Sequence, residues 1–470
     1  MTSETQPPRL FGTSGIRGGL ERVSTELALD LGRSLGTSLS PGACVSIGTD
    51  ARESGAMLLS AFVAGVQSAG VNVLLLGLVP MPLAAFYSTY PNISVSVMLT
   101  ASHNPPSDNG FKFFRNGREF IRSEEILIEQ VVREKSFRTA PWTMIGHTMQ
   151  REAKDEYLHH LLDFLRSRGG VADGMRVVID SANGAATNYT PSLLENLGFA
   201  VVTMNSHIDG WFPGRPPEPS PANLAETMDV ARELGAGVTI CHDGDGDRLA
   251  VIDERGQFVD QNRVIALFAK SELERVGGGK VVVSIDTSSV IDEIVNSCGG
   301  ELVRVPLGSL QYEIARDTNH EIVFASEPWK PIFLESGGWM DGILGAARFA
   351  QLTYTDGNGK CTMLMRGIPE YPVLREQIHC PDELKSDFMK SVRTLLKSEV
   401  SNIDKVLEVD GIRIDRADGS YVLVRVSGTE PKARVYIGAR TRETLDKLRQ
   451  ISQRIMEQSL GQARAMKHGG

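Results

Sequence analysis

The sequence lacks the features that would place the protein in a membrane or outside the cell. None of its apolar runs reaches the roughly 18 residues that a membrane-spanning helix requires. Its N-terminal residues do not show a basic segment followed by an apolar one, the pattern of a secretory signal. Its five cysteines are odd in number and widely spaced, without a C-x-x-C pair, so neither a disulfide framework nor a zinc site is indicated. We expect a cytoplasmic protein with reduced thiols and no membrane partner.

The sequence also lacks an excess of positive charge. The net charge is −9, and no basic stripe with interleaved aromatic residues is present, which argues against nucleic acid as a partner. Any recognition of phosphate must therefore depend on a few local residues. A chain of 470 residues is too long for a single hydrophobic core, so three or four domains are expected.

Three segments each combine a β-branched run with an aspartate near its end. They are CVSIGTDARESG, RVVIDSANGAAT and VVVSIDTSSV, with Asp50, Asp180 and Asp286. Amphipathic stretches such as EYLHHLLDFLRS lie between them, and this alternation predicts α/β domains with mostly parallel sheets. Three related domains in series fit the spacing, although many α/β proteins contain strand-end aspartates.

The C-terminal part has a different pattern. From about Val373 apolar and polar residues alternate, a hairpin signal occurs at Asp418 and Gly419, and the amphipathic stretch TRETLDKLRQISQRIMEQ follows. This pattern predicts a smaller α+β domain. The expected domains are residues 1–150, 151–255, 256–370 and 371–470.

A serine lies in a rigid turn after an apolar run. In TASHNPPSDNG, residues 100–110, Ser102 and His103 follow the run ISVSVML and precede two prolines. The G-x-S-x-G motif of many hydrolases is not present, and no catalytic triad is evident. A plain turn is the simpler interpretation. The rigidity that the prolines impose favours a reacting side chain instead.

Three aspartates alternate with glycines in VTICHDGDGDRLAVID. Asp243, Asp245 and Asp247 can converge on one side of a tight loop, and crowded carboxylates require a hard divalent cation. Glu254 falls at position twelve of an EF-hand, but position six is Arg248 instead of glycine and both flanks resemble strands. The sequence therefore favours a Mg²⁺ loop between strands. Magnesium usually keeps a phosphate oxygen among its ligands, which makes Arg248 a candidate partner for that phosphate.

A third stretch, RVSGTEPKAR, combines arginines with hydroxyl groups and a glycine. This combination suits a phosphate dianion, although a plain turn between strands is the alternative. A rigid serine, a magnesium loop and a phosphate site together indicate phosphoryl transfer to and from serine, which depends mainly on positioning and charge neutralisation.

With these motifs, the sequence resembles the α-D-phosphohexomutases, the family of phosphoglucomutase, phosphomannomutase and phosphoglucosamine mutase. The segments that carry the resemblance are LFGTSGIRGG, TASHNPPSDNGFKFF, DGDGDRLAVID, DGI at 341–343 and RVSGTEPKARVYI, in the family's order. The resemblance covers almost the whole chain. It implies four domains around a central cleft, namely three related α/β domains with mixed, mostly parallel sheets and a C-terminal α+β domain that grips phosphate.

The resemblance also implies roles for individual residues. Ser102 would be the phosphorylated serine and a fourth Mg²⁺ ligand beside the three aspartates. Lys112 would transfer protons, with His103 and Arg17 nearby. The phosphate that does not react would be held by Arg425, Ser427, Gly428, Thr429 and Arg434. Phosphoserine would give its phosphoryl group to a sugar monophosphate, and the resulting sugar bisphosphate would turn around and return the other phosphate.

The loop that reads the sugar departs from the family pattern. The family usually has Gly-Glu-x-Ser-Gly-His, whereas this chain has ASEPWKPIF. Glu327 is retained and, with Trp329 and Lys330, is expected to bind the sugar, although Trp329 fits a packing role equally well. The expected function is a phosphoglucosamine mutase or phosphomannomutase. The alternatives are a phosphopentomutase, a phosphoglucomutase or a catalytically weak regulatory relative that binds sugar phosphates. The expected partner is a small sugar phosphate, with a homodimer left open.

Overall fold

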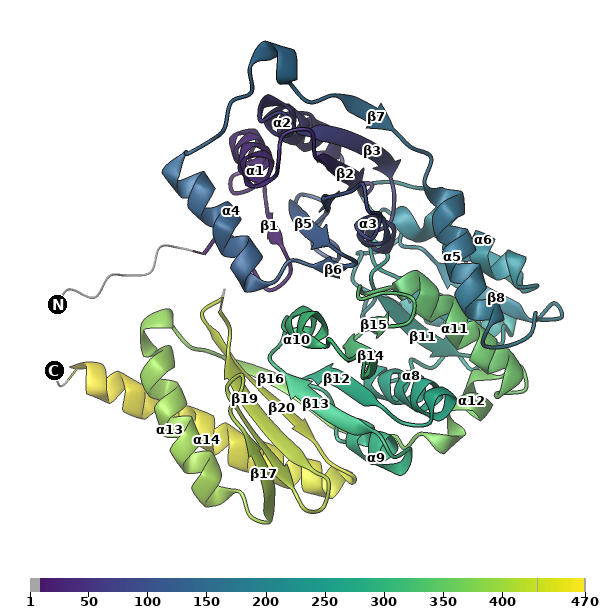
Figure 1. The fold of residues 1–470 in the computed structure, drawn as a ribbon. Coiled ribbons are helices and arrows are strands. Elements are labelled where there is room, and N and C mark those ends of the chain that lie inside the picture. The colour runs from purple at the N-terminus through teal and green to yellow at the C-terminus, as the bar shows by residue number, and fades with distance from the viewer. Residues whose placement is uncertain (1–8, 429, 469–470) are drawn as a thin grey trace. The chain divides into compact units, whose positions relative to one another are not determined.

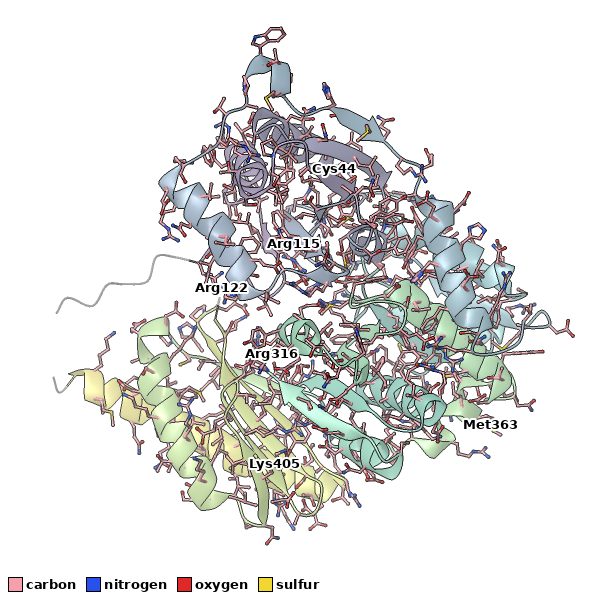
Figure 2. All side chains as sticks on the ribbon, viewed as in Figure 1. Cys44, Arg115, Arg122, Arg316, Met363 and Lys405 are labelled. Carbon is pink, nitrogen blue, oxygen red and sulfur yellow. The ribbon has the colours of Figure 1, made fainter. Side chains whose placement is uncertain are left out.

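The computed structural model describes residues 9–428 and 430–468 (Figure 1). The chain forms two compact units, and each combines segments from separate parts of the sequence. The first unit consists of Met1–Gln261, Gln311–His320 and Trp329–Arg366. The second consists of Asn262–Leu310, Glu321–Pro328 and Gly367–Gly470. The five cysteines are free thiols, and Cys44, labelled in Figure 2, lies at the start of a strand.

The first unit begins with a mixed sheet in the order β1-β5-β4-β2-β3-β7, with β6 paired to β5. The strands are β1 (Ile16–Gly18), β2 (Cys44–Thr49), β3 (Asn72–Leu78), β4 (Val95–Leu99), β5 (Asn109–Arg115), β6 (Arg118–Glu119) and β7 (Thr148–Gln150). Strands β4, β2, β3 and β7 are parallel, whereas β5 is antiparallel to β4 and to β1. Every residue of β4 is buried, as expected for a strand with a continuous apolar run at the centre of a sheet.

A second sheet in the first unit has the order β11-β10-β8-β9. Its strands are β8 (Arg176–Asp180), β9 (Ala200–Met204), β10 (Val238–His242) and β11 (Leu249–Asp253). Strands β9, β8 and β10 are parallel, and β11 returns antiparallel to β10. Asp50 and Asp180 thus lie at the carboxyl ends of parallel strands, where open α/β sheets usually place their ligands.

Helices surround these sheets. They are α1 (Thr25–Ser38), α2 (Gly55–Ser68), α3 (Met81–Tyr87), α4 (Arg122–Glu134), α5 (Lys154–Arg166), α6 (Thr190–Asn196), α7 (Ala225–Leu234), α11 (Gly342–Thr355) and α12 (Cys361–Leu364). Helix α5 contains the amphipathic stretch noted in the sequence, and it buries residues at helical spacing such as Tyr157, Leu161 and Leu165. Strand β15 (Lys330–Phe333) also belongs to this unit.

The second unit contains a parallel sheet and an antiparallel sheet. In the parallel sheet, β12 (Lys280–Ser284) pairs with β13 (Glu301–Val305) and with β14 (Ile322–Glu327). The accompanying helices are α8 (Gln261–Val276) and α9 (Val290–Ser297), whereas α10 (Leu310–Arg316) belongs to the first unit from Gln311 onward. The three α/β sheets therefore have the mixed, mostly parallel character that the sequence predicts.

The C-terminal part of the second unit is an antiparallel sheet in the order β16-β20-β19-β18-β17. Its strands are β16 (Val373–His379), β17 (Ile403–Leu407), β18 (Ile412–Arg416), β19 (Tyr421–Val426) and β20 (Lys432–Gly438). Helices α13 (Lys385–Glu399) and α14 (Arg442–His468) lie side by side and share one apolar core with it (Figure 1). The predicted turn at Asp418 and Gly419 joins β18 to β19, which confirms the hairpin, and edge strand β17 exposes charged residues such as Lys405 (Figure 2).

Within residues 9–428 and 430–468, every helix is too short or too polar to span a lipid bilayer.

Candidate functional site

Ser102 lies in a strained loop between β4 and β5. Its φ is +52°, a left-handed conformation that is uncommon for a residue other than glycine. The backbone N–H of Ser102 donates to Thr100 Oγ1 over 2.8 Å, and Asn104 N–H donates to the Ala101 carbonyl over 3.0 Å. The side chain is fully buried. The surrounding structure therefore holds this serine in one orientation.

A buried arginine holds the loop in this shape. The Arg52 guanidinium donates to backbone carbonyl oxygens of Ser102 (2.9 Å), Asn104 (2.7 Å), Asp108 (2.7 Å) and Pro105. The carboxylate of Asp50 accepts from Arg52 Nε over 3.1 Å and fixes the guanidinium in turn. The planar, multidentate geometry of arginine suits this task, which a lysine ammonium does not match.

The three aspartates of the predicted metal loop converge. Asp243, Asp245 and Asp247 are fully buried, and one potential ligand oxygen from each lies within 4.8 Å of the others. The loop joins β10 to β11, and its ends are closed by the antiparallel pair of His242 with Leu249. Asp243 Oδ1 accepts the backbone N–H groups of Gly246 (3.1 Å) and Arg248 (3.2 Å), which fixes the tight turn.

The serine and the aspartates form one site. Ser102 Oγ donates to Asp243 Oδ2 over 2.6 Å. Burial, with the negative charges of Asp247 and Asp245, raises the pKa of Asp243 well above its usual range. Thr100 Oγ1 lies 2.7 Å from Asp50 Oδ2 and 3.2 Å from Asp245 Oδ2, so it connects the serine loop to the metal loop.

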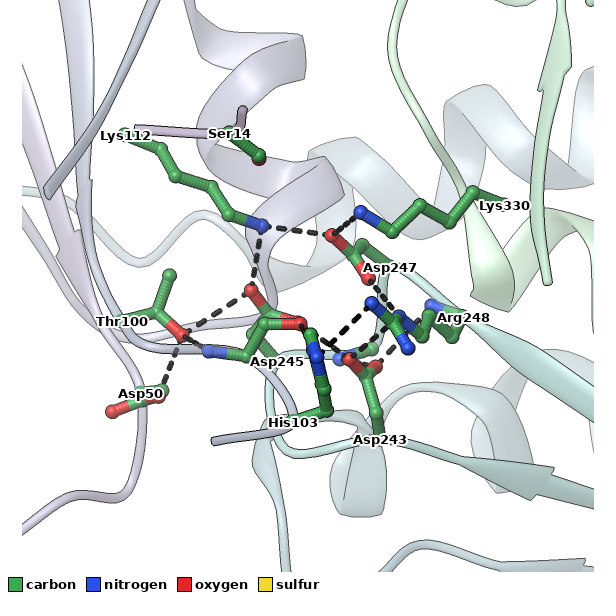
Figure 3. Close-up of polar contacts among 12 residues, drawn as sticks. Ser14, Asp50, Thr100, His103, Lys112, Asp243, Asp245, Asp247, Arg248 and Lys330 are labelled. Atoms are coloured by element: carbon green, nitrogen blue, oxygen red, sulfur yellow. Dashed lines mark hydrogen bonds and ion pairs between the residues drawn. The ribbon is translucent and has the colours of Figure 1, made fainter. Parts of the chain in front are cut away.

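Lys112 compensates two of the carboxylates. Its Nζ lies 2.9 Å from Asp245 Oδ2 and 2.7 Å from Asp247 Oδ2 (Figure 3). Burial alone would lower the pKa of Lys112, but Asp245 and Asp247 outweigh it and raise that pKa above its usual range. Burial would likewise raise the pKa of Asp247, but Lys112, Lys330 and Arg248 bring it well below its usual value. The lysine is therefore an ammonium ion in this arrangement.

The residues of the triad fit a divalent cation. Asp245 Oδ1 and Asp247 Oδ1 are buried and have no hydrogen-bond partner among the described residues. Buried carboxylate oxygens without a donor are costly unless an ion binds them. Three carboxylates and a serine oxygen form the hard donor set that Mg²⁺ or Ca²⁺ requires. Ser102 and the three aspartates, the residues predicted as ligands, lie together.

Basic side chains border the same site. Arg248 Nε lies 3.8 Å from both Asp243 Oδ2 and Asp247 Oδ1, and Lys330 Nζ lies 3.6 Å from Asp247 Oδ2. Arg17 donates to Ser14 Oγ over 3.2 Å, and Ser14 Oγ donates to the Glu119 carboxylate over 3.0 Å. Arg248 and Lys330 thus place positive charge beside the carboxylates, and Arg17 is close enough to lower the pKa of His103.

His103 is a neutral imidazole in this setting. Burial, with the positive charges of Arg248 and Arg17, lowers its pKa far below the usual value. Its Nε2 lies 3.5 Å from Arg248 Nη2 and its Nδ1 lies 3.4 Å from Ser102 Oγ, both long contacts. Because a guanidinium can only donate, the contact with Arg248 favours Nε2 as the acceptor and Nδ1, on the side of the serine oxygen, as the protonated nitrogen.

Trp329 is packed beneath the site. It adopts a φ of +69° and its side chain packs against an apolar cluster that includes Leu224, Cys241 and Ile252. The centre of its ring lies 5.9 Å from the Arg248 guanidinium, and its carbonyl oxygen accepts the Leu249 N–H over 2.9 Å. These contacts agree with the packing role that the sequence left open. They also fix the backbone from which Lys330 reaches Asp247.

The predicted phosphate site lies in the second unit. Arg425 on β19 and Arg434 on β20 are directly opposite in the antiparallel register, so their side chains project from the same face. Like charges at such positions repel, and here Arg425 pairs with Asp410 over 2.8 Å while Arg434 pairs with Glu430. The turn between the strands carries Ser427, which is buried, and Gly428, which is exposed. Thr429 lies outside the described residues.

Glu327 also belongs to the second unit. It ends β14, and its carboxylate accepts the backbone N–H of Gly308 over 2.5 Å. Glu327 and Gly308 are thereby tied together, and Ser309 follows directly. Glu327 is thus held in place at the end of a strand.

Several residues of the site were missed by sequence reasoning. No local signal marks Thr100, Ser14, Glu119 or the contact of Lys330 with Asp247. These contacts depend on which segments become neighbours in the fold. Arg52 does carry a local signal. It follows the strand-end Asp50 by two residues, a spacing that lets the carboxylate accept both the backbone N–H and the Nε of the arginine.

Comparisons with known proteins agree with this geometry. Models of the phosphoglucomutase/phosphomannomutase family match the chain in order: alpha/beta/alpha domain I at residues 8–139, domain II at 155–256, domain III at 260–371 and the C-terminal domain at 378–452. A phosphopentomutase of Thermococcus kodakarensis is 42% identical over 443 residues, which cover 94% of this chain and 96% of that protein.

Other relatives have a different name. A "probable phosphoglucosamine mutase" of Methanothermobacter thermautotrophicus is 36% identical over 465 residues, covering 97% of this chain and 99% of that protein. Among solved structures, a phosphoglucomutase/phosphomannomutase family protein from Burkholderia thailandensis superposes with a TM-score of 0.85 at 25% identity, covering 96% of this chain and 97% of that one. The chain therefore belongs to the phosphoglucomutase/phosphomannomutase family, the α-D-phosphohexomutases, and is an enzyme that transfers a phosphoryl group intramolecularly.

Proposed function

We propose that this enzyme is a phosphosugar mutase that moves a phosphoryl group between the anomeric carbon and the terminal carbon of a sugar phosphate through phosphorylated Ser102. The observation that carries the proposal is the 2.6 Å hydrogen bond from Ser102 Oγ to Asp243, within a buried triad of carboxylates. An isolated serine turn would need neither the strained backbone nor this surrounding charge. A sugar bisphosphate is the intermediate and also the activator that first phosphorylates Ser102.

The cation that we propose for the triad is Mg²⁺, with Asp243, Asp245, Asp247 and the serine oxygen as its protein ligands. When bound, Mg²⁺ would supply charge neutralisation for the transferring phosphoryl group. The donorless oxygens of Asp245 and Asp247 support this assignment, because hard carboxylate oxygens suit Mg²⁺. Glycines on both sides of Asp245 keep the loop tight enough for the carboxylates to converge.

The basic residues have separate proposed roles. Lys112 holds a proton against the carboxylates of Asp245 and Asp247 and is the candidate for proton transfer with the sugar hydroxyl. Arg248, beside His103, and Arg17, held by Ser14, orient the oxygens of the phosphoryl group. His103 directs its Nδ1 proton toward the serine oxygen. Preorganised donors of this kind stabilise developing charge without needing to reorganise.

The second unit would bind the parts of the substrate that do not react. We propose that Arg425, Arg434, Ser427, Gly428 and Thr429 hold the distal phosphate, replacing the pairing of the arginines with Asp410 and Glu430. Glu327 would accept hydrogen bonds from sugar hydroxyl groups. Because the sugar bisphosphate must bind in two orientations, one distal site would receive either phosphate in turn.

The substrate has two candidates. A hexosamine or hexose phosphate, exchanged between positions 1 and 6, is supported by relatives named phosphoglucosamine mutases, at 34–38% identity. A pentose phosphate is supported by the phosphopentomutase at 42% identity. The sugar-reading loop also favours the pentose, because the side chains at the usual Ser and Gly positions are a packed Trp329 and a Lys330 directed at Asp247. These side chains offer fewer contacts to the hydroxyl groups of a larger sugar.

A turnover panel tests the proposal. Purified protein with Mg²⁺ and a catalytic amount of the matching sugar bisphosphate is assayed on the 1-phosphates of glucosamine, mannose, glucose and ribose, with Ser102→Ala as the negative control. We expect isomerisation of at least one substrate by the wild type and none by the variant. Phosphate release in excess of isomerisation would identify a phosphatase. No turnover on any substrate would favour a sugar-phosphate-binding regulatory protein. Light scattering on the same sample tests the homodimer.

A further inference from the structure

The segment 209–215, DGWFPGR, lies between β9 and α7 and is not part of any motif described above. We refer to it as the spacer loop. Asp209 N–H donates to the Asn183 carbonyl over 3.0 Å, and Gly214 N–H donates to Asn183 Oδ1 over 3.0 Å, so both ends of the segment are fixed to the loop after β8. Between these ends the chain is shaped tightly, with Phe212 at a φ of +51°.

One side of the spacer loop contacts the residues that hold the serine. Phe212 is only 5% exposed, and its ring centre lies 5.2 Å from the Arg52 guanidinium. Arg52 is the residue whose hydrogen bonds to backbone carbonyls shape the serine loop. Gly210 packs against the same strand end, since a Cβ atom there would lie 2.3 Å from the Ala51 carbonyl oxygen. A side chain at Gly210 would push the two segments apart.

The other side of the spacer loop contacts the residues that hold the metal loop. Arg215, also buried, donates to the carbonyl oxygen of His242 over 2.7 Å and to Asp180 over 2.9 Å. His242 directly precedes the first aspartate of the triad, and its Nδ1 lies 2.9 Å from the Arg248 carbonyl at the other end of the loop. Arg215 therefore fixes the base of the metal loop as Arg52 fixes the serine loop.

The two loops and the spacer loop meet at Gly244. A Cβ atom at Gly244 would lie 2.7 Å from the Ser102 carbonyl oxygen and 3.2 Å from the Phe212 ring. Ser102 and the triad belong to different sheets, so no single element of secondary structure sets the distance between them. The spacer loop touches the support of each.

We propose that the spacer loop sets the position of Ser102 relative to the carboxylate triad, with Phe212 and Arg215 as positioning residues. A misplacement of about 1 Å between reacting groups can reduce a rate by about a hundredfold, so a fixed spacing between the two loops has direct catalytic value. The kinetic part of this inference rests on the proposed mutase activity. The structural part, which concerns the order of the two loops, does not.

The test compares three variants of the full-length protein. Phe212→Leu keeps an apolar side chain but removes the aromatic face under Arg52. Arg215→Lys keeps the charge but cannot reach both Asp180 and His242. Trp211→Leu is the matched control, because this neighbour in the same loop is 70% exposed. The readouts are hydrogen exchange of peptides that cover residues 101–110, the affinity for Mn²⁺ measured by electron paramagnetic resonance, and kcat and KM.

We expect a different response from each side of the spacer loop. Phe212→Leu should speed exchange in residues 101–110 roughly fivefold or more and leave Mn²⁺ affinity within about twofold of the wild type. Arg215→Lys should weaken Mn²⁺ binding about tenfold, as loss of outer supports of metal sites does. Both variants should lower kcat about tenfold or more while KM changes little. The Trp211→Leu control should match the wild type in every measurement.

Two results would overturn the inference. In the first, hydrogen exchange and Mn²⁺ affinity in both Phe212→Leu and Arg215→Lys equal the values of Trp211→Leu. In the second, the two variants show a uniform increase of hydrogen exchange along the whole chain, which would mean that the spacer loop contributes only general stability. If the wild type itself turns over no substrate, the proposed function fails, and the exchange and Mn²⁺ measurements still decide whether the spacer loop orders the two loops.

Discussion

Replacement of Asp245 by Asn separates the metal function of the triad from its contribution to folding. The change keeps the shape of the side chain and removes one buried charge. The potential ligand oxygens of the triad lie within 4.8 Å of one another, so each pair of charges repels by at least about 3.5 kcal/mol at an effective dielectric constant of about 20. Removing Asp245 relieves the repulsion from Asp247 and, to the extent that Asp243 is ionised, that from Asp243, which together come to about 3.5–7 kcal/mol.

The same change removes one attraction. Lys112 Nζ lies 2.9 Å from Asp245, which corresponds to about 6 kcal/mol on the same scale. Lys112 keeps its other partner, Asp247, at 2.7 Å. The two effects differ by a few kcal/mol at most, so the metal-free variant should unfold within a few degrees of the wild type. Its affinity for Mg²⁺ should fall at least about a hundredfold, because even outer supports of metal sites contribute tenfold to a hundredfold.

Thermal unfolding in EDTA and across a Mg²⁺ titration measures both quantities. We expect Mg²⁺ to raise the melting temperature of the wild type and to have little effect on Asp245→Asn. Asp229→Asn, the same substitution at an exposed position in α7 of the same unit, is the control and should respond as the wild type does. A variant that unfolds far below the wild type in EDTA, or that Mg²⁺ stabilises equally, would refute the assignment of the triad as a cation site.

Three further predictions concern other residues. Intact mass should show a fraction of wild-type chains that is heavier by one phosphate. This fraction should be absent in Ser102→Ala and retained in Ser107→Ala, which changes an exposed serine of the same loop. A phosphorylated Ser102→Ala protein would place the phosphate elsewhere. Arg425→Ala should raise KM about tenfold to a hundredfold with a small change in kcat, because a charge-assisted hydrogen bond contributes about 1.5–3 kcal/mol. The control Arg416→Ala, on β18 of the same sheet, should leave KM unchanged. An unchanged KM in Arg425→Ala would locate the phosphate site elsewhere. Burial lowers the pKa of His242 to about 4 from its usual 6.5, so between these pH values the unfolded chain binds a proton that the folded chain does not. The free energy of unfolding should therefore fall by roughly 3 kcal/mol in total as the pH drops from about 6.5 to 4. Urea unfolding at several pH values should show a smaller fall for His242→Gln than for the wild type. An equal dependence on pH in the two proteins would contradict this assignment.

Much of the site was predictable because short segments carry it. The triad belongs to a few consecutive residues between two strands, so its convergence follows from local geometry once the strands are recognised. Ser102 is likewise marked by the prolines that follow it and by the apolar strand before it. The mostly parallel sheets and the C-terminal hairpin follow from apolar periodicity and from turn residues such as Asp418 and Gly419.

The supports of the site were not predictable because they join distant segments. Arg52 reaches the serine loop about fifty positions away, and Lys330 reaches Asp247 from a different part of the chain. Trp329 illustrates the difficulty, because stacking on a sugar and packing into a core require the same aromatic surface. In the structure, the Trp329 side chain contacts an apolar cluster. No pattern within a window of sequence distinguishes these alternatives.

The sequence by itself therefore determined which residues are the candidates for the chemistry, because the type and spacing of side chains within a loop limit what that loop can bind. The tertiary structure alone decided how the loops are placed relative to one another. That placement depends on buried contacts between remote segments, such as Phe212 beneath Arg52 and Lys112 between Asp245 and Asp247. Such contacts form only when the sheets pack, since their energy comes from burial that no single segment achieves alone.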